Sequence, residues 1–367
     1  MSTRVLRFLL INYMIIYTIM DTAIVNTILV TDGVPKKFSI EKSLEYNDIN
    51  LLSYRDMTSR KIYISNKLNR GSYNTIYNIS ASLETSHCGT DIILRISDKK
   101  VLPENIKMEL RGIRKQFKLS RKNSNIGFVV DYGRLVSNKD DSHQEYSILQ
   151  KYGVSLKETL EHRNAYKSIM VPLKFIKNFL EAVDVIHKSG YAHLDLKPSN
   201  ILLKKVLKKC DIISDLDFAL IDFGAVRKFK TDKSKFIKAQ MASAAFSPPE
   251  LTKRCYGKKS DIWAFGVIAF LVIQNRFFFK AGGEKLFVNT NPEVISTNIT
   301  RELTKLRRII VPSKFKKTTD IETYLGIMSS NSNMDILTDF FMQLFTIDSS
   351  KRPNTDKLLK HELFNLI

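Results

Sequence analysis

Two short stretches of the sequence carry residue types that suit phosphoryl transfer. The first is HLDLKPSN, which starts at His193, and the second is DFG, which starts at Asp222. The carboxylate of Asp195 can accept the proton of an attacking hydroxyl, and the ammonium of Lys197 can neutralise charge on the moving phosphoryl group. The carboxylate of Asp222 and the amide of Asn200 offer oxygen ligands of the kind that Mg2+ prefers. The alternative interpretation, a polar loop between two strands, leaves the order of the later motifs unexplained.

The pattern HxDxKxxN followed by DFG resembles the catalytic loop and the metal-binding loop of the eukaryotic protein kinases. The lysine two residues after Asp195, with Pro-Ser-Asn beyond it, is similar to the serine/threonine branch of that superfamily. The resemblance implies a two-lobed α+β fold, with a small β-rich N-lobe, a larger helical C-lobe and the nucleotide between them. It also implies that ATP and Mg2+ are the cofactors and that proteins are the substrates. The compact, lysine-rich sequence resembles kinases of large DNA viruses.

Several residues of these stretches are expected to support the site without reacting. By the resemblance, His193 and Phe223 have a packing role, and Gly224 permits the backbone turn after the metal ligand. Leu194 departs from the family pattern, which commonly has an arginine that gathers a phosphate on the activation segment. We therefore expect a loop that is ordered by other means.

Motifs further along the chain resemble the protein-substrate platform of the kinase superfamily. Pro-Pro-Glu, which ends at Glu250, is similar to the family's Ala-Pro-Glu, and Arg352 matches the arginine that pairs with this glutamate. Because buried ion pairs are costly to break singly, the presence of both partners is informative. Asp261 matches the aspartate that holds the backbone of the catalytic loop. Ser243 falls where a threonine often bridges the catalytic aspartate and lysine.

The nucleotide-binding side departs further from the family pattern. The stretch LNRGSYNTI, from Leu68 to Ile76, aligns with the kinase pattern G-x-G-x-x-G-x-V. By this resemblance we expect Leu68 and Ile76 to contact the nucleotide. Of the three glycines only Gly71 is present, and Asn69 and Asn74 take the other two positions. Glycines let the backbone approach phosphates, and asparagine is the next most tolerant of left-handed geometry. We therefore expect the turn to persist and the phosphate cradle to fit less closely.

Arg95 stands where the family has the lysine that contacts the α/β-phosphates and pairs with a helix glutamate. Glu109 is the expected partner, because apolar residues follow it with helical spacing, and Glu104 is the alternative. Arginine keeps the charge of lysine and can pair with a carboxylate, but it is bulkier and differently shaped. We therefore expect an imperfect contact with phosphate and weak ATP affinity.

The expected adenine side of the nucleotide site lies around the connection between the lobes. Leu149 is the predicted gatekeeper, and Gln150 and Tyr152 belong to the predicted hinge. Ile93 replaces a small alanine that normally lies against adenine, which narrows the slot. The passage YGVSL, which starts at Tyr152, resembles the hinge of the casein kinase and vaccinia-related kinase branches.

These residues are compatible with two classes of function. The leading hypothesis is ATP- and Mg-dependent phosphorylation of serine or threonine in proteins, because the phosphoryl-transfer residues are complete. The alternative is a pseudokinase that acts as a binding or scaffold module with weak or no phosphoryl transfer, because the nucleotide-binding residues are altered. We favour the enzyme, since a chain without catalytic duty has little physical need for all four transfer residues. A small-molecule kinase of related fold is less favoured, because the platform motifs point to protein substrates.

The net charge of the sequence indicates which kinds of molecule the protein could bind. The 367 residues include 58 lysines and arginines against 37 aspartates and glutamates, a net charge of +21. The positive electrostatic potential of such a charge attracts polyanions and acidic protein segments. The activation segment is basic and forms part of the substrate platform in this fold, so we expect acidic residues around the target hydroxyl. Nucleic acid ranks second, because the basic runs lack interleaved aromatic residues, and a solvated basic surface is the remaining alternative.

Residues 1–57 are predicted to be a lead-in to the domain. Within them an apolar run over residues 8–20 follows two arginines, is too short for a membrane span and resembles a signal-peptide core with a poor cleavage pattern. Two internal methionines are alternative starts. The three cysteines show neither disulfide nor zinc spacing, which favours a reducing compartment and a cytoplasmic or nuclear protein. Secretory or membrane targeting by residues 1–30 stays an alternative.

The hydrophobic patterns predict an N-lobe over residues 58–150 and a C-lobe over residues 151–367. Alternation of apolar residues indicates strands in the first part, and helical periodicity dominates the second. The expected strands lie near 61–64, 76–79, 92–96, 126–135 and 146–149. The expected helices lie over 104–119, 173–188, 261–273, 335–345 and 355–364.

Overall fold

The computed structural model divides the chain into two compact units, formed by residues 1–117 with 128–151 and by residues 118–127 with 152–367. The residues that the structure describes are 48–57, 59–70, 74–79, 91–98, 103–136, 144–162, 165–205, 207, 211–229, 231, 235–236, 244–250, 255–276, 278, 292–304, 306 and 318–367. The architecture is α+β, with a β-rich first unit and a mostly helical second unit.

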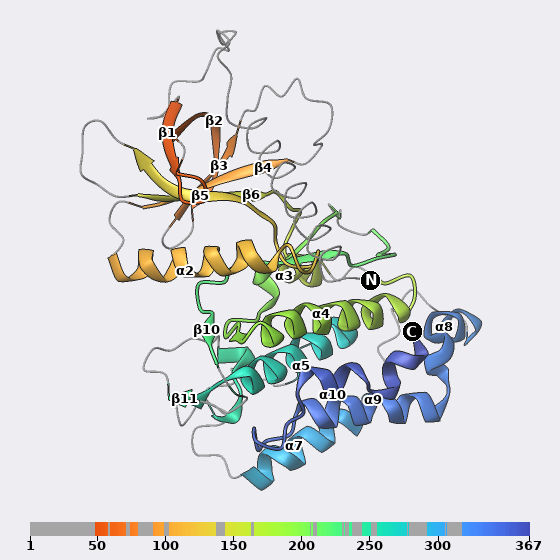
Figure 1. Ribbon diagram of the computed structural model, residues 1–367. Helices are drawn as coiled ribbons and strands as arrows, with labels where there is room; N and C mark the ends of the chain where they lie inside the picture. Colours follow the sequence, from red (N-terminus) through yellow and green to blue (C-terminus); the bar gives the residue numbers. More distant parts are fainter. Residues whose placement is uncertain are drawn as a thin grey trace, which may run out of the picture. The chain divides into compact units, whose positions relative to one another are not determined.

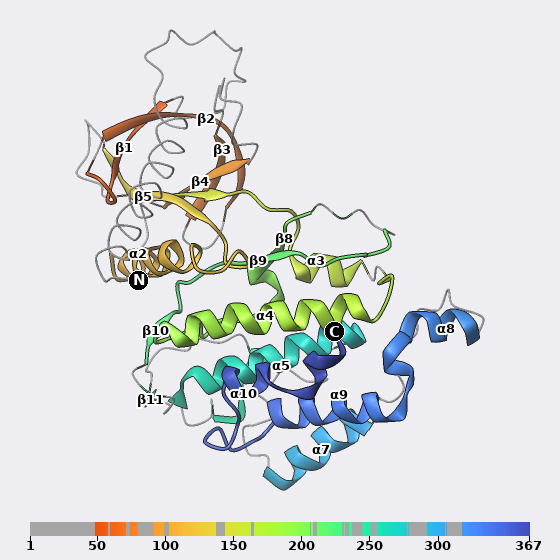
Figure 2. The ribbon, with the colours of Figure 1, turned by 45° about the vertical axis from the view of Figure 1, so that its right-hand side comes forward.

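Six antiparallel strands of the first unit form a closed barrel in the order β1-β2-β3-β4-β6-β5, which Figure 2 shows from one end. The strands are β1 (Asp48–Ser53), β2 (Ser59–Arg70), β3 (Asn74–Ile79), β4 (Ile92–Ser97), β5 (Val129–Val136) and β6 (Glu145–Gln150). Alternate apolar side chains point inward, where Leu51, Leu94 and Ile148 are fully buried. This alternation is the sequence pattern that predicts strands, because successive side chains of a strand point to opposite faces.

Strand β1 lies within residues 1–57, which the sequence analysis assigned to a lead-in, and it was not among the predicted strands. The strand pairs with both β2 and β5, and this double pairing closes the sheet into a barrel. Gly133 of β5 permits the close approach, because a Cβ at this position would collide with the carbonyl oxygen of Leu52. The pairing joins residues far apart in the chain, which local patterns do not reveal.

Helix α2 (Pro103–Leu119) runs alongside the barrel (Figure 1). The helix predicted from the sequence begins one residue later and ends at the same residue. Its inner face packs against β5 through apolar side chains. The contacting residues are Leu110, Ile113 and Phe117 of α2 with Val129 and Tyr132 of β5. This packing fixes the side of α2 that faces the barrel.

The second unit consists mostly of α-helices, together with short two-stranded sheets. Its α-helices are α3 (Leu156–Glu161), α4 (Met170–Lys188), α5 (Lys258–Gln274), α7 (Pro292–Thr304), α8 (Thr318–Leu325), α9 (Asn331–Leu344) and α10 (Thr355–Leu359). Two-stranded sheets pair β7 (Tyr191–Ala192) with β10 (Arg227–Lys228), β8 (Ile201–Leu203) with β9 (Phe218–Leu220), and β11 (Lys235–Phe236) with β12 (Cys255–Tyr256). Short 3-10 turns lie at Pro198–Asn200, Ala244–Phe246, Gly326–Ser329 and Glu362–Leu366. Helices α3, α7 and α8 were not among the predicted helices, and the helix predicted over residues 355–364 ends at Leu359 and is followed by a 3-10 turn.

Helices α4 and α5 lie side by side at the centre of this unit (Figures 1 and 2). Helix α5 is apolar nearly all round and is buried along its length, as its sequence predicts. Helix α4 buries the predicted apolar stripe and ends at Lys188. Gly190 follows with a φ of +83°, and its N–H donates to the carbonyl oxygen of His187, so the predicted glycine stop is present.

The apolar character of the helices is that of a protein core. Among the helices of the described residues, none combines the length and the hydropathy needed to cross a membrane. The apolar run over residues 8–20 lies outside the described residues, and so do Gly71 and Ser243.

Candidate active site

The loop from His193 to Asn200 brings three of the predicted site residues together. Lys197 Nζ lies 2.7 Å from Asp195 Oδ2. Asn200 Nδ2 donates to the backbone carbonyl oxygen of Asp195 at 2.9 Å and to its Oδ2 at 3.2 Å. The 3-10 turn that begins at Pro198 folds the asparagine back toward the aspartate. Asp195 Oδ1 makes no hydrogen bond to the described residues, so one oxygen of this carboxylate is held and the other is available.

Asp261, in the first turn of α5, holds the backbone of this loop. Its Oδ2 accepts from the N–H of His193 at 2.7 Å, and its Oδ1 accepts from the N–H of Leu194 at 2.8 Å. Leu194 has a φ of +65°, which is unfavourable for a bulky residue, and the two hydrogen bonds to the carboxylate offset this cost. His187 Nε2 lies 2.9 Å from Asp261 Oδ2 and was missed by the sequence analysis, because its only signal was a place in the buried stripe of α4.

The ring of His193 packs edge-on against Phe223, with the ring centroids 4.9 Å apart. Asp222, just before the turn at Gly224, is in the left-handed region with a φ of +62°. Asp222 Oδ1 accepts from the N–H of Gly224 at 3.3 Å, and a Cβ on Gly224 would lie 3.3 Å from the same oxygen. Gly224 therefore makes room for the Asp222 carboxylate, and it lies in the turn that the N–H of Val226 closes on the carbonyl oxygen of Phe223 at 3.1 Å.

Burial shifts the pKa values of two groups in this loop. It raises the pKa of the Asp195 carboxyl above its usual value, while the hydrogen bond and the charge of Lys197 oppose the shift. Burial also lowers the pKa of His193, with the carboxylate of Asp261 as the main opposing influence. His193 Nδ1 accepts a hydrogen bond from the N–H of Asp195 at 3.3 Å. A ring nitrogen can accept only when it carries no proton, so this hydrogen bond is consistent with a neutral imidazole.

Two oxygen donors of the second unit suit a magnesium ion. Asn200 uses its amide nitrogen on Asp195, and its Oδ1 makes no hydrogen bond to the part of the chain that the structure describes. Asp222 is exposed, and its Oδ2 is likewise without such a bond. Mg2+ is bound through one or two carboxylates, water and substrate phosphates, so this donor set fits the ion.

In the first unit, two departures from the nucleotide-binding pattern meet at one carboxylate. Arg95 Nη2 lies 2.7 Å from Glu109 Oε2, which is the pairing expected from the helical spacing. Asn74 Nδ2 donates to Glu109 Oε1 at 3.0 Å and to Oε2 at 2.9 Å. Glu104, the alternative partner, is exposed in the first turn of α2. Nε and Nη1 of Arg95 make no hydrogen bond to the described residues, so they can contact a phosphate.

The other residues of the predicted phosphate loop lie at its two strand ends. Leu68 is 42% exposed on β2, and Asn69 is also exposed, with its Oδ1 accepting from the N–H of Arg70. Ile76 is half-buried on β3. These strands lead into and out of the residues around Gly71.

The residues predicted at the adenine side divide between the two units. Leu149 is half-buried and packs against the cluster that α2 forms with β5. The N–H of Gln150 donates to the carbonyl oxygen of Phe128 at 3.0 Å. Tyr152 is half-buried in the second unit.

Arg352 and Glu250 form the predicted ion pair in a two-point geometry. Arg352 Nη1 lies 2.9 Å from Glu250 Oε1, and Nη2 lies 3.1 Å from Oε2. The Arg352 side chain is fully buried, and its Nε donates to the carbonyl oxygen of Thr346 at 3.0 Å. Ser260 Oγ donates to Glu250 Oε1 at 3.3 Å. The pair thus joins the residues before α5 to those before α10.

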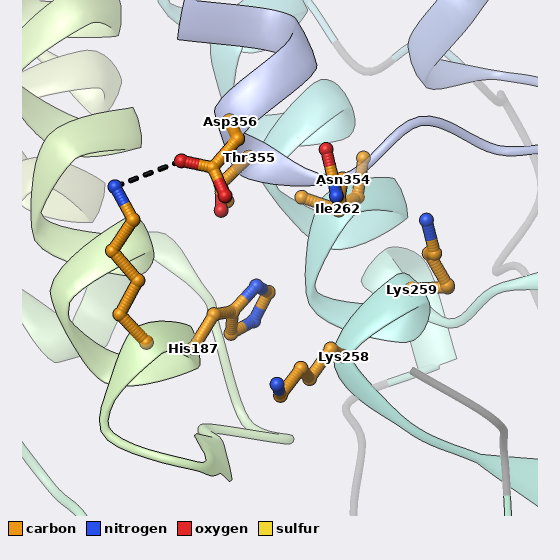
Figure 3. Close-up of a pocket in the computed structure, with 8 residues that line it drawn as sticks. His187, Lys258, Lys259, Ile262, Asn354, Thr355 and Asp356 are labelled. Carbon is orange, nitrogen blue, oxygen red and sulfur yellow. Dashed lines mark ion pairs between the residues drawn. The ribbon is translucent and has the colours of Figure 1, made fainter. Parts of the chain in front are cut away.

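A separate pocket of the second unit lies where α4 ends and where α5 and α10 begin (Figure 3). Its lining includes His187, Lys258 and Asp356 but none of the predicted site residues. Lys188, which also lines it, pairs with Asp356 at 2.8 Å and with Asp184 at 2.7 Å.

Comparison with known proteins identifies the family. The model of the protein kinase domain matches residues 64–364, so the chain belongs to this family and has its two-lobed α+β fold. A probable cyclin-dependent serine/threonine-protein kinase of Dictyostelium discoideum is 24% identical over 308 residues, which are 80% of this chain and 20% of that protein. Calcium-dependent protein kinase 4 of Plasmodium falciparum is 25% identical over 189 residues, 51% of this chain and 33% of that protein. A serine/threonine-protein kinase of Candida albicans is 26% identical over 238 residues, 60% of this chain and 22% of that protein.

These relatives are much longer than the region they share with this chain. The chain covers a fifth to a third of their lengths. The similarity therefore supports protein phosphorylation as the general activity of the domain.

Proposed function

We propose that this chain is an active, ATP- and Mg-dependent kinase that phosphorylates serine or threonine in protein substrates. The observation that carries the proposal is the arrangement around Asp195. One oxygen of its carboxylate is held by Lys197 and Asn200, and the other oxygen is available to a substrate hydroxyl. A polar loop with a purely structural role has no need for a carboxylate that is half-buried and left with one available oxygen.

Asp195 acts as the general base in this proposal. Its Oδ1 accepts a hydrogen bond from the substrate hydroxyl and takes the proton as that oxygen bonds to the γ-phosphorus and the bond to the ADP oxygen breaks. The raised pKa makes Asp195 a stronger base than an ordinary aspartate. Lys197 lies beside the reacting oxygens as a fixed positive charge.

Asn200 and Asp222 would hold Mg2+ through their available oxygens, and Mg2+ neutralises phosphate charge when it is bound. Arg95 would contact the α/β-phosphates with Nε or Nη1 while Nη2 stays on Glu109. The planar guanidinium of Arg95 is bulkier than the ammonium of the lysine that the family has at this position. We therefore propose that the chain binds ATP weakly. The basic surface would select acidic protein segments as substrates, in a cytoplasmic or nuclear setting.

A pseudokinase is the second candidate function. It is favoured by the changed nucleotide side, where Arg95 replaces lysine and Asn69 and Asn74 replace glycines. In that case the chain would bind protein partners without transferring phosphate.

A nucleotide titration with a transfer assay separates the two candidates. Purified chain is titrated with ATP in the presence and absence of Mg2+, and transfer of the labelled γ-phosphate to casein, an acidic protein, is measured in parallel. The enzyme predicts Mg-dependent ATP binding and transfer that depends on Asp195. Binding of casein without any transfer at saturating ATP would establish the pseudokinase.

A further inference from the structure

The turn after strand β1 contacts helix α2 through two side chains. The turn comprises residues 54–57, and we call it the β1 turn. Tyr54 packs against the apolar cluster that joins α2 to β5, and the guanidinium of Arg114 lies over its ring at 5.6 Å. The guanidinium of Arg55 lies over the ring of Phe117 at 5.3 Å. Both contacts fall on the C-terminal half of α2.

The β1 turn is itself fixed to the barrel. The N–H of Tyr54 donates to the carbonyl oxygen of Tyr132 at 3.0 Å, and Arg55 Nη1 donates to the carbonyl oxygen of Val130 at 2.9 Å. Just before the turn, the hydroxyl of Ser53 donates to the fully buried Asp131 at 2.7 Å. Three consecutive residues are therefore anchored on β5, so the two side chains that reach α2 start from a rigid base.

A hydrogen bond connects the turn to the surroundings of Glu109. The hydroxyl of Tyr54 donates to Glu145 Oε1 at 3.1 Å. Glu145 lines a cavity of the first unit that is also lined by Arg95, Glu109 and residues of α2. The turn thus touches both α2 and a wall of the cavity in which the ion pair of Arg95 and Glu109 lies.

The position of α2 decides whether Glu109 reaches its partners. Glu109 projects from the middle of the helix and meets Arg95 of β4 and Asn74 of β3. A rotation or shift of α2 by a fraction of its pitch would separate these atoms, because a hydrogen bond weakens steeply beyond about 3.2 Å. Contacts that hold the helix against β5 therefore also hold the ion pair.

We propose that Tyr54 and Arg55 are positioning residues that lock α2 in the orientation that pairs Glu109 with Arg95. The β1 turn lies before residue 64, where the match to the protein kinase domain begins. The inference rests on the proposed function in one respect: its effect on phosphate contact assumes that Arg95 binds nucleotide. The mechanical part, the hold on α2, stands without that assumption.

The test uses full-length variants and two measurements. Hydrogen exchange over residues 103–119 reports the hold on α2, and direct titration with ATP and Mg2+ reports the nucleotide site. Tyr54→Ala removes the ring contact, and Tyr54→Phe removes only the hydroxyl. Tyr77→Ala is the matched control, because Tyr77 packs against the barrel cluster that contains no residue of α2. Arg55→Met gives a second route if Tyr54→Ala does not fold.

We expect Tyr54→Ala to raise the exchange rates of α2 amides about ten-fold over wild type, the size expected for the loss of one aromatic and one cation–π contact. ATP affinity falls in the same variant, Tyr54→Phe retains both properties, and Tyr77→Ala leaves α2 protected. Arg55→Met should act in the same direction as Tyr54→Ala.

Equal protection of α2 in Tyr54→Ala and Tyr77→Ala would overturn the lock. The same holds if Arg55→Met leaves α2 as protected as in wild type. Failure of the proposed function would look different, because wild type would then transfer no phosphate while the exchange pattern of α2 still changed among the variants.

Discussion

The side-chain amide of Asn74 donates to both carboxylate oxygens of Glu109, the residue that also pairs with Arg95. Asn74 stands where the kinase pattern has a glycine, and Arg95 stands where it has a lysine. The two departures meet at one carboxylate, so they are structurally connected. An arginine that shares Glu109 with Asn74 keeps Nε and Nη1 for other contacts, whereas an unshared carboxylate would attract the guanidinium in a two-point pair.

Replacing Asn74 by aspartate should therefore weaken nucleotide binding. Asn74→Asp keeps the shape of the side chain, removes its donors and places a second carboxylate beside Glu109. Loss of hydrogen bonds to a charged group is worth roughly 1.5–3 kcal/mol, so the Kd for ATP should rise about ten-fold or more. Calorimetric titration with ATP and Mg2+ measures the change, and a thermal melt close to that of wild type shows that the barrel is intact. An unchanged Kd would mean that Asn74 has no part in the nucleotide site.

The candidate site residues of the loop from His193 to Asn200 were predictable from the sequence because they are close together in it. Asp195, Lys197 and Asn200 lie within six positions, and Asp261 was found through its own motif. The all-round apolar character of α5 likewise predicted a buried helix. Local spacing and side-chain chemistry carry this kind of information directly.

Contacts between distant residues were not predictable in the same way. Asn74 and Glu109 are 35 positions apart, and Ser53 and Asp131 are 78 apart, so no local pattern connects them. Strand β1 was missed because its short sequence becomes a strand through pairing with β2 and β5. The left-handed backbone angle of Asp222 was not predicted either, because a φ above zero at a residue other than glycine leaves no clear signal in the sequence.

Replacing Asp195 by asparagine should abolish phosphate transfer and leave stability unchanged or slightly higher at pH 7. Burial raises the pKa of this carboxyl in the folded chain, so folding favours the protonated form. Stability therefore falls as pH rises from the unfolded pKa through the folded pKa, and a neutral amide avoids this loss. Transfer of labelled phosphate and a thermal melt measure the two effects. Equal transfer by wild type and the variant, both free of contaminating kinase, would refute Asp195 as the base.

The pH dependence of kcat/KM should show the same raised pKa. Asp195 must be ionised to accept a proton, so the acidic limb of the profile should lie above the ordinary aspartate value of 3.8. Lys197 lowers the pKa of Asp195, and Lys197→Met should therefore move the acidic limb to higher pH while also lowering kcat. A limb that stays in place in Lys197→Met would show that another group controls it.

Removal of Glu250 should strongly destabilise the second unit. Glu250→Ala leaves the guanidinium of Arg352 buried without its carboxylate, and breaking a buried pair in this way costs about 3–5 kcal/mol. Glu161→Ala is the matched control, because Glu161 pairs with Lys157 at 3.8 Å and both side chains are more than 60% exposed. The control should change the free energy of unfolding by less than about 1 kcal/mol. Denaturant unfolding followed by fluorescence of Trp263, which lies under Arg352, compares the two variants.

Neutralising the basic activation segment should weaken the selection of acidic substrates. Arg227 and Lys228 form β10, and Lys233, Lys235 and Lys238 continue the basic segment along the chain. By family resemblance this segment contributes to the platform for the substrate peptide, where positive charge attracts acidic side chains and speeds encounter at low salt.

The measurement is a peptide array at fixed ionic strength, in which serines carry acidic, neutral or basic flanks. Glutamine at Lys233, Lys235 and Lys238 should reduce phosphorylation of acid-flanked serines several-fold and leave neutral peptides nearly unchanged. Glutamine at three exposed lysines near the C-terminus, Lys351, Lys357 and Lys360, removes the same charge at another place and should leave the preference intact. Equal effects of the two triple variants would assign the preference to net charge. A preference for basic flanks would show that the segment does not select substrates in this way.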